Sequence, residues 1–454
     1  MDKKYEDFLK SKQIVSSSKG LDVNPDDISD KLFDFQRDIV VWALKKGRCA
    51  IFAGTGLGKT LMQLEWSKHV GKVIILAPLA VSQQTVEEGK KFGISVNLCK
   101  SQDDVKDGIN ITNYERLDRF DFSAFDGVVL DESSILKSMT GKVRTQLIEV
   151  CRKVPYRLAC TATPAPNDLM ELCNHSEFLN VMSANEMLAT FFVHDGGDTS
   201  KWRLKKHAKK SFWEWVASWA VMLTNPEELG YDGSRYQLPK LSIYQHTVET
   251  EKDVGLLFQA EALTLQERQA ARRNSVEQRA EKCAGLVKDG QWIIWCNLNS
   301  EADALARMIP EAVEVRGSDT PEKKEKAALD FASGKIRILI SKPLIFGMGL
   351  NFQRCHQMAF VGLSDSFEQY YQSVRRCWRF GQEHPVDVHV ITADTEGAVV
   401  ANIENKERIF SEMLSGMISA TQELTKENIR ATSKQTDEYK PTVTMNLPQW
   451  LLAA

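Results

Sequence analysis

The chain of 454 residues has a formal net charge of −3, with 43% hydrophobic and 26% charged residues. This length exceeds one ordinary core, so we expect two domains of about 150–200 residues with accessory segments. No run of about 18 or more apolar residues suggests a membrane span, and the N-terminus lacks the apolar core of a signal peptide. We therefore expect a soluble, cytoplasmic protein without a membrane partner; protein partners are not legible from composition.

The nine cysteines stand apart without a CxxC pair. This spacing favours reduced, buried thiols over disulfides or zinc. Because the net charge is near zero, any contact with a polyanion must be a local groove. The densest basic segment, interleaved with Trp202 and His207, is either a solvated helix face or a surface that follows phosphates. Its cations are Lys201, Arg203, Lys205, Lys206, Lys209 and Lys210.

Residues 1–31 form an N-terminal segment, and residues 32–164 alternate helix-period segments with short apolar runs. That alternation predicts a parallel sheet covered by helices on both faces, the first α/β lobe. Its strand candidates are Cys49–Ala53, Lys72–Ala77, Ile109–Thr112, Gly127–Glu132 and Arg157–Thr163.

Residues 165–240 read as a helical insertion. Its tryptophans at helical spacing are more often core residues than platforms for bases, and a strand-separating hairpin is not legible in it. A long charged helix is expected over Glu251–Lys288. Residues 241–395 predict a second parallel α/β lobe, and residues 396–454 a C-terminal helix, expected to pack on that lobe, with a tail. The second lobe's strand candidates are Gln291–Asn297, Glu311–Val315, Ile336–Ser341, Met358–Gly362 and Val386–Thr392.

The segment GTGLGKT follows an apolar strand and opens a helix, the context of a phosphate-binding loop. Glycines allow consecutive backbone N–H groups to face one anion, and the helix N-terminus adds its dipole. Lys59 is placed to reach the β- and γ-phosphates, and Thr60 to ligate Mg²⁺. The pattern predicts binding of ATP with Mg²⁺ by Gly54, Thr55, Gly56, Leu57, Gly58, Lys59 and Thr60.

Three further groups complete the expected chemistry. Asp131, at the end of an apolar strand, would hold the Mg²⁺ shell, and Glu132 would polarise the attacking water. The amide of Gln36 can pair with an adenine edge. Arg376 and Arg379, three residues apart on one helix face, suit the charge that develops on a transferring phosphoryl group.

Taken in order, these motifs resemble the superfamily 2 helicases and translocases, most closely the Swi/Snf-type double-stranded DNA translocases. The resemblance extends from about Leu32 to Thr392. It rests on FQ at 35–36, GTGLGKT, APLAVSQQT at 77–85, ITNYERL at 111–117, DESS at 131–134, TATPAPNDLMEL at 161–172, SKPLIFGMGLN at 341–351 and QSVRRCWRFGQ at 372–382.

The resemblance implies two RecA-like lobes in tandem. It makes Gln36 the adenine reader, Lys59 and Glu132 catalytic, and Arg376 and Arg379 the arginine fingers. It assigns Thr161 and Thr163 to coupling between ATP and nucleic acid, and a strand-tracking face to Thr85, Thr112, Gly347 and Gly349.

The sequence departs from the family pattern in two places. Ser133-Ser134 ends the acidic box where remodelling enzymes usually have Ala-His, and Arg375 stands where glycine is usual, which leaves open which two of three arginines act as fingers.

The resulting expectation is a minimal ATP-dependent motor on DNA, with double-stranded DNA favoured over RNA, in a prokaryotic or phage-infected cell. An RNA helicase of the same superfamily and a non-catalytic, ATP-binding nucleic-acid clamp remain alternatives, as does a phosphotransferase acting on a small substrate.

Overall fold

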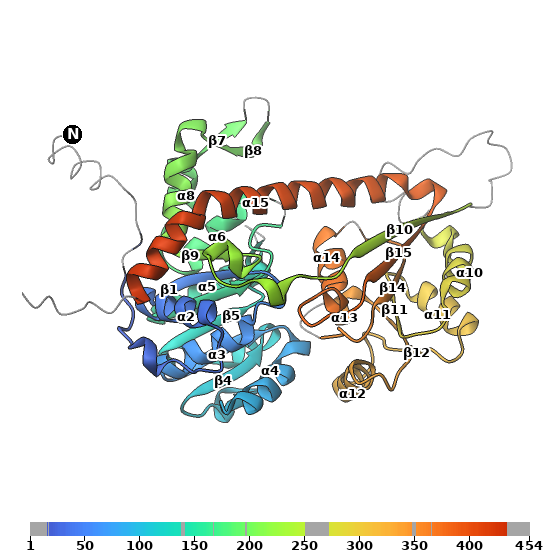
Figure 1. The fold of residues 1–454 in the computed structure, drawn as a ribbon, viewed down its shortest axis with the longest axis horizontal. Helices are drawn as coiled ribbons and strands as arrows, with labels where there is room; N and C mark the ends of the chain where they lie inside the picture. The colour runs from blue at the N-terminus through green and yellow to red at the C-terminus, as the bar shows by residue number, and fades with distance from the viewer. Residues whose placement is uncertain are drawn as a thin grey trace, which may run out of the picture.

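The computed structural model describes residues 16, 18–137, 141–166, 168–195, 198–249, 272–346, 351–364 and 366–433. Two parallel sheets, each flanked by helices, lie side by side, and one long helix runs across both (Figure 1). This arrangement confirms the predicted α/β architecture of two RecA-like lobes. No helix within the described ranges is both long and apolar enough to cross a membrane.

The first lobe holds a seven-stranded sheet in the order β3-β4-β2-β5-β6-β1-β9, with every neighbouring pair parallel. Successive residues of a strand enter different cores: Ala50 and Phe52 of β1 lie in one, Ile51 in the other. The strands are β1 (Arg48–Ala53), β2 (Val73–Ala77), β3 (Val96–Leu98), β4 (Ile109–Asn113), β5 (Gly127–Asp131), β6 (Tyr156–Thr161) and β9 (Ala220–Leu223). The helices are α2 (Asp34–Lys46), α3 (Lys59–Val70), α4 (Leu79–Phe92), α5 (Lys142–Val150), α6 (Leu172–Phe178), α7 (Ala184–Phe191) and α8 (Lys209–Ala217).

The second lobe holds a six-stranded parallel sheet in the order β10-β15-β14-β11-β13-β12. The strands are β10 (Leu241–Val248), β11 (Trp292–Cys296), β12 (Val313–Glu314), β13 (Ile338–Ser341), β14 (Gln357–Val361) and β15 (Val386–Ala393). The helices are α10 (Val276–Leu286), α11 (Asn299–Met308), α12 (Pro321–Ala332), α13 (Pro343–Phe346), α14 (Phe367–Cys377) and α15 (Gly397–Ser433). The charged helix expected over residues 251–288 is described only from residue 272 onward.

The segment between the two sheets is more than helical. It contributes α6, α7 and α8, but also an antiparallel hairpin, β7 (Phe192–Asp195) with β8 (Asp198–Leu204), and strand β9, which pairs with β1. Three of its tryptophans are core residues, and Trp202 on β8 is half-buried; the core residues are Trp213, Trp215 and Trp219.

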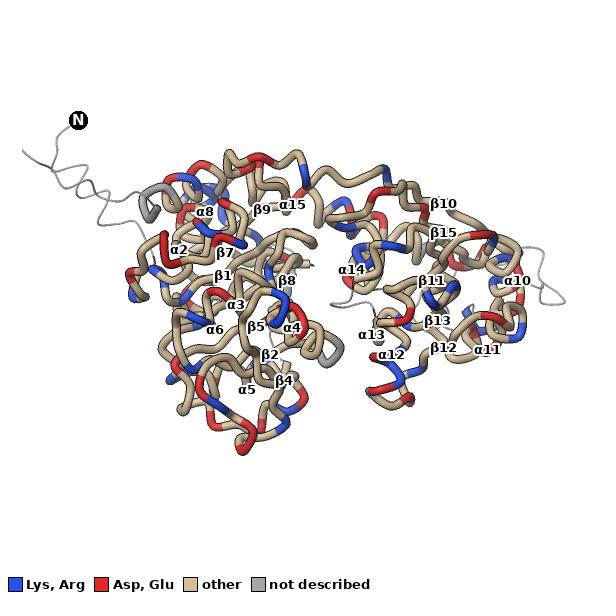
Figure 2. The backbone as a smooth tube through the Cα atoms, turned by 60° about the horizontal axis from the view of Figure 1, so that its bottom comes forward, with Lys and Arg blue, Asp and Glu red and all other residues tan. Residues whose placement is uncertain are grey.

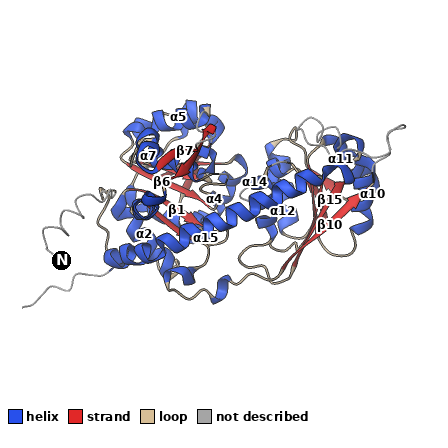
Figure 3. Cartoon of the chain, turned by 90° about the horizontal axis from the view of Figure 1, so that it is seen from above, coloured by secondary structure: helices blue, strands red, loops and turns tan. Residues whose placement is uncertain are grey.

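The C-terminal helix α15 packs on the second lobe, as expected, and also on the first. Val399 and Phe410 lie in the core of the second lobe, whereas Met417 and Ile429 lie in the two cores of the first. The Asn428 amide also donates to the Ala217 carbonyl at 3.1 Å. Seen from above, α15 passes over the gap between the sheets (Figure 3).

All nine cysteines are buried and none forms a disulfide.

Candidate functional site

The predicted phosphate-binding loop joins β1 to α3. Gly56 and Gly58 adopt φ angles of 92° and 78°, a region that L side chains rarely occupy. The Gly54 N–H donates to the Leu223 carbonyl at 2.9 Å, so β9 anchors the start of the loop. The Lys59 ammonium donates to the carbonyls of Ala53 and Gly54 at 2.8 and 3.2 Å. The loop therefore keeps its curvature through bonds within the chain.

Gln36 lies beneath this loop at the start of α2. Its Oε1 accepts from the Phe33 N–H at 3.0 Å, and its Nε2 donates to the Leu57 carbonyl at 2.9 Å. An amide has two N–H donors and two acceptor lone pairs, and these bonds use one of each. Gln36 thus positions the loop, and its reading of adenine stays a prediction.

The acidic pair lies at the carboxyl end of β5. Asp131 accepts from Gln63 Nε2 at 2.8 Å, and burial, with a smaller contribution from the adjacent Glu132, raises its pKa to about 6. Glu132 has a φ of 54°, uncommon for a residue with a side chain, and accepts from the Thr161 hydroxyl at 3.3 Å. Two carboxyl groups held this closely favour a cation between them and the loop.

The predicted coupling residues are directly connected to this pair. The Thr163 N–H donates to Thr161 Oγ1 at 3.1 Å, and that hydroxyl contacts Glu132. Both threonines are fully buried. The end of β6 is thus linked to the Glu132 carboxylate by a hydrogen bond.

The second lobe presents its arginines from the end of α14. Arg376 is buried and donates from Nε and Nη2 to the carbonyl and side chain of Gln372, each at 3.0 Å. Burial and the neighbouring Arg379 lower the pKa of Arg376 to about 10, while Glu132 and Asp131 oppose that shift. The acidic pair of one lobe and this arginine of the other thus lie within electrostatic range.

Arg379 and Arg375 differ in their surroundings. Burial lowers the pKa of Arg379, and Glu88 and Glu132 of the first lobe oppose that shift. The Arg375 guanidinium instead lies 4.3 Å from the ring centre of Trp378 and 5.2 Å from that of Tyr371. Carboxylates of the first lobe therefore influence the pKa of Arg376 and of Arg379, whereas Arg375 stacks on aromatic rings of its own lobe.

The two lobes also touch at the loop itself. A Cβ placed on Gly56 would lie 2.8 Å from Cβ of Phe380 and 3.0 Å from its backbone nitrogen. Phe380 also packs against Tyr236 in the connection between the lobes, with ring centres 4.8 Å apart. Loop and arginine segment are thus brought together in this structure.

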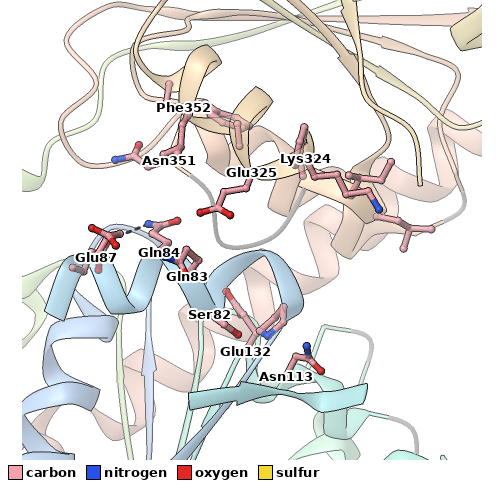
Figure 4. A pocket seen from close by; sticks show the side chains of 18 of the residues that line it. Ser82, Gln83, Gln84, Glu87, Asn113, Glu132, Lys324, Glu325, Asn351 and Phe352 are labelled. Atoms are coloured by element: carbon pink, nitrogen blue, oxygen red, sulfur yellow. Dashed lines mark hydrogen bonds between the residues drawn. The ribbon is translucent and has the colours of Figure 1, made fainter. Parts of the chain in front are cut away.

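A cavity of about 1610 Å³ opens between the lobes and reaches Glu132. Figure 4 shows Ser82 and Gln83 of α4 on one wall, Lys324 and Glu325 of α12 on the other, and Asn113 near its floor. The lining therefore draws on the motifs at 77–85 and 111–117 of the first lobe, and on the end of the motif at 341–351 of the second, in Asn351.

In this structure the side chains of Thr85 and Thr112 are buried, and their contact with a nucleic-acid strand stays a prediction. Thr85 is 2% exposed and donates to the Val81 carbonyl, and Thr112 is fully buried and donates to the Cys99 carbonyl. Thr85 is thus bonded within α4, and Thr112 to the residue that follows β3. Gly347 and Gly349 lie outside the described residues.

Neighbouring residues of the same motifs line the cavity instead. Ser82 Oγ and Asn113 Oδ1 are buried without a hydrogen-bond partner among the described residues. Buried polar atoms are rarely left unpaired, so these two suit a polar ligand in the cavity. Sequence reasoning missed them, although Asn113 directly follows Thr112 at the carboxyl end of β4.

Two parallel-sheet lobes, a phosphate loop, an acidic pair and opposed arginines define a helicase-type ATPase core. A family model described as "Helicase conserved C-terminal domain" matches residues 278–381, which include both arginines.

The chain resembles the mouse protein "DNA annealing helicase and endonuclease ZRANB3", with 28% identity over 166 residues, 32% of this chain and 16% of that protein. The protein of the same description from cattle is 28% identical over 170 residues, covering 33% of this chain and 16% of its own length. This chain thus matches only a small part of these relatives' length.

A solved structure described as "S. cerevisiae Dbp5 bound to RNA and ADP BeF3" shares the fold, with a TM-score of 0.50 and 14% identity over 90% of this chain and 100% of that one. The family match and the likeness to ZRANB3 support the resemblance to the superfamily 2 helicases, and ZRANB3 fits the Swi/Snf type; the solved structure shows the shared fold alone.

Proposed function

We propose that the chain is an ATP-dependent motor that moves along DNA, with double-stranded DNA favoured. The main observation behind the proposal is that Glu132 lines the interlobe cavity and lies within electrostatic range of Lys59 and Arg376. ATP hydrolysis and contact with a nucleic-acid strand would then both involve the Glu132 carboxylate.

The residues present fit ATP with Mg²⁺, which would supply the phosphoryl group and the metal charge. Lys59 would exchange the carbonyls of its own loop for phosphate oxygens, and Thr60 and Asp131 would hold the metal. Glu132 would orient water and take up its proton, while Arg376 and Arg379 would stabilise charge on the phosphoryl oxygens. Thr161 would report the state of Glu132 to the strand cavity.

The choice of DNA follows the likeness to ZRANB3, which is described as a DNA annealing helicase and endonuclease. The alternative of an RNA helicase is kept because the Dbp5 structure contains RNA. A non-catalytic clamp is the less favoured alternative, because the acidic pair and both arginines are present and Glu132 lies within electrostatic range of both arginines.

The test is steady-state ATP turnover with duplex DNA, single-stranded DNA, duplex RNA and single-stranded RNA at matched salt. We expect the largest stimulation with duplex DNA, and a loss of turnover in Lys59→Ala, Glu132→Gln and Arg376→Ala. Arg375→Ala is the matched control, because this arginine stacks on aromatic rings and should retain most activity. Equal turnover in wild type and all variants would exclude a motor, and stimulation by RNA alone would select the RNA helicase.

A further inference from the structure

The β7-β8 hairpin and the start of α8 form a basic surface away from the cleft. The hairpin stands out from the first lobe beyond α8 (Figure 1), and basic positions gather around α8 (Figure 2). Its stem is fixed by a cross-strand pair, His194 with Trp202, whose ring centres lie 3.7 Å apart. The Lys205 ammonium donates to the Ala189 and Thr190 carbonyls at the end of α7, so this lysine anchors the stem.

The other described cations of this segment face outward. α8 buries Phe212 and Val216 against the core of the first lobe, which confines its polar residues to the outer face. Lys210 lies 3.7 Å from Glu214 and its side chain is still 89% exposed. The exposed cationic or titratable residues are Arg203, Lys206, His207, Lys209 and Lys210.

The position of these lysines has an energetic cost. Lys209 and Lys210 occupy the first turn of α8, which contains no acidic residue. Cations at a helix N-terminus oppose the positive end of the helix dipole, whereas an anion there is stabilised. The first turn of α8 therefore favours an external anion in addition to the attraction of the lysines themselves.

The interlobe cavity offers no excess of positive charge among its described lining residues. Its described lining contains eight glutamates but six Lys or Arg residues. These are Glu87, Glu88, Glu115, Glu132, Glu322, Glu325, Glu368 and Glu383, against Lys91, Lys100, Arg116, Lys137, Lys324 and Arg354. Since phosphate contacts dominate the affinity of proteins for nucleic acids, a motor with this cavity needs a cationic surface elsewhere.

We infer that the outer face of the hairpin stem and the first turn of α8 binds the phosphate backbone of duplex DNA, outside the cleft. Single-strand sites add exposed aromatic platforms to their cations. Here the tryptophans of α8 are core residues, and Trp202 is half-buried against His194. A face of lysines without an open Trp, Tyr or Phe among its described residues suits a duplex, whose phosphates lie outermost.

This inference rests on the proposed function, because it assigns a second contact for the same DNA. The surface would hold the duplex while the lobes open and close on one strand. The inference predicts that this surface strengthens the binding of DNA and takes no part in hydrolysis itself.

The test is a triple variant, Lys206→Gln, Lys209→Gln and Lys210→Gln. The matched control removes three exposed lysines of the second lobe, Lys323→Gln, Lys326→Gln and Lys335→Gln. Binding of a fluorescent duplex and of a single strand of equal length is measured by anisotropy without nucleotide over a range of salt. Each lost phosphate contact lowers the magnitude of the slope of log affinity against log salt by about 0.9. For duplex DNA, the slope of the triple variant should therefore be smaller in magnitude than that of the wild type by up to about 2.7.

The control variant should keep the wild-type slope, and both variants should keep the wild-type ATP turnover without DNA. Unchanged duplex affinity and slope in the triple variant would overturn the inference. The inference would also be overturned if the triple variant bound duplex DNA like the wild type and lost only binding to anionic vesicles or to an acidic peptide. If DNA fails to bind or stimulate the wild type, the proposed function fails; if it stimulates wild type and triple variant at the same concentration, only this inference fails.

Discussion

Lys137 and Glu368 form an ion pair that joins the two lobes across the interlobe cavity. Lys137 ends the short 3₁₀ helix that follows Glu132, and Glu368 lies in the first turn of α14, which carries Arg376 at its far end. The backbone at Lys137 is held in turn by Asn174 of α6, whose amide donates to the Leu136 carbonyl at 2.7 Å. The pair therefore fixes α14 relative to the acidic box.

Reversing either charge should misalign the arginines. We expect Lys137→Glu and Glu368→Lys each to lower kcat for ATP by about tenfold, equivalent to about 1.4 kcal/mol, with a smaller change in the KM for ATP. The double variant, which restores an ion pair of opposite polarity, should recover most of the loss. Lys142→Glu, a charge reversal outside the cavity, is the control. Additive losses in the double variant would contradict a direct pair.

Gly56 is constrained both by its backbone and by the facing lobe. Its φ of 92° strains any other residue, and the added methyl of Gly56→Ala would meet Phe380. We expect this variant to lower the free energy of unfolding by about 1–3 kcal/mol without nucleotide. Gly54→Ala is the control, because its Cβ would lie 3.4 Å from Thr224 and its φ is not in the left-handed region. Thermal melting of both variants without ligand separates strain from lost phosphate binding.

The buried His175 gives the fold a pH dependence. Burial lowers its pKa to about 4, and its ring lies 3.1 Å from the Ser133 hydroxyl in the acidic box. The unfolded chain binds this proton near pH 6.5, so between pH 6.5 and 4 the unfolded state binds more protons and stability falls as pH falls. The loss is on the order of 3 kcal/mol.

We expect His175→Asn to flatten this part of the profile. Urea unfolding at a series of pH values between 4 and 8 would compare its slope with that of wild type. Parallel profiles would show that carboxylates elsewhere set the acid sensitivity.

The candidate phosphate loop and acidic pair could be predicted from the sequence because each has a local physical reason. Lys59 follows glycines that only a tight loop requires, and Asp131 ends an apolar strand. The predicted contacts with a nucleic-acid strand were harder to locate from the sequence. The sheet is covered on both faces, so a polar side chain reaches the cavity only where a β-strand ends. Asn113 meets that condition, whereas Thr112 lies one residue too early.

Long-range packing was the other part that local patterns could not predict. β9 is an apolar tetrapeptide beside a tryptophan-rich helix, so its pairing with β1 depends on the tertiary fold. The apolar stripe of α15 shows that one face is buried, but not that the stripe passes from one lobe to the other.

The packing of α15 on both lobes can be tested with two substitutions that shorten side chains of this helix. Phe410→Ala should destabilise the second lobe by about 3–5 kcal/mol, and Met417→Ala the first lobe by about 2–5 kcal/mol. Hydrogen exchange of peptides from β14 and from β1 would assign each loss to its lobe. Equal loss of protection in both lobes from either variant would mean that the lobes unfold as one unit.

A continuous helix seated in both lobes also has an elastic consequence. At about 1.5 Å per residue, the 37 residues of α15 span about 55 Å. When the lobes move apart, we expect α15 to bend near Gly416, whose Cβ position is open space. Gly416→Ala should stiffen this point and slow the conformational cycle without changing either core, measurable as a lower stimulated kcat at unchanged melting temperature. The helix would then store elastic energy when the cleft opens and release it when the cleft closes.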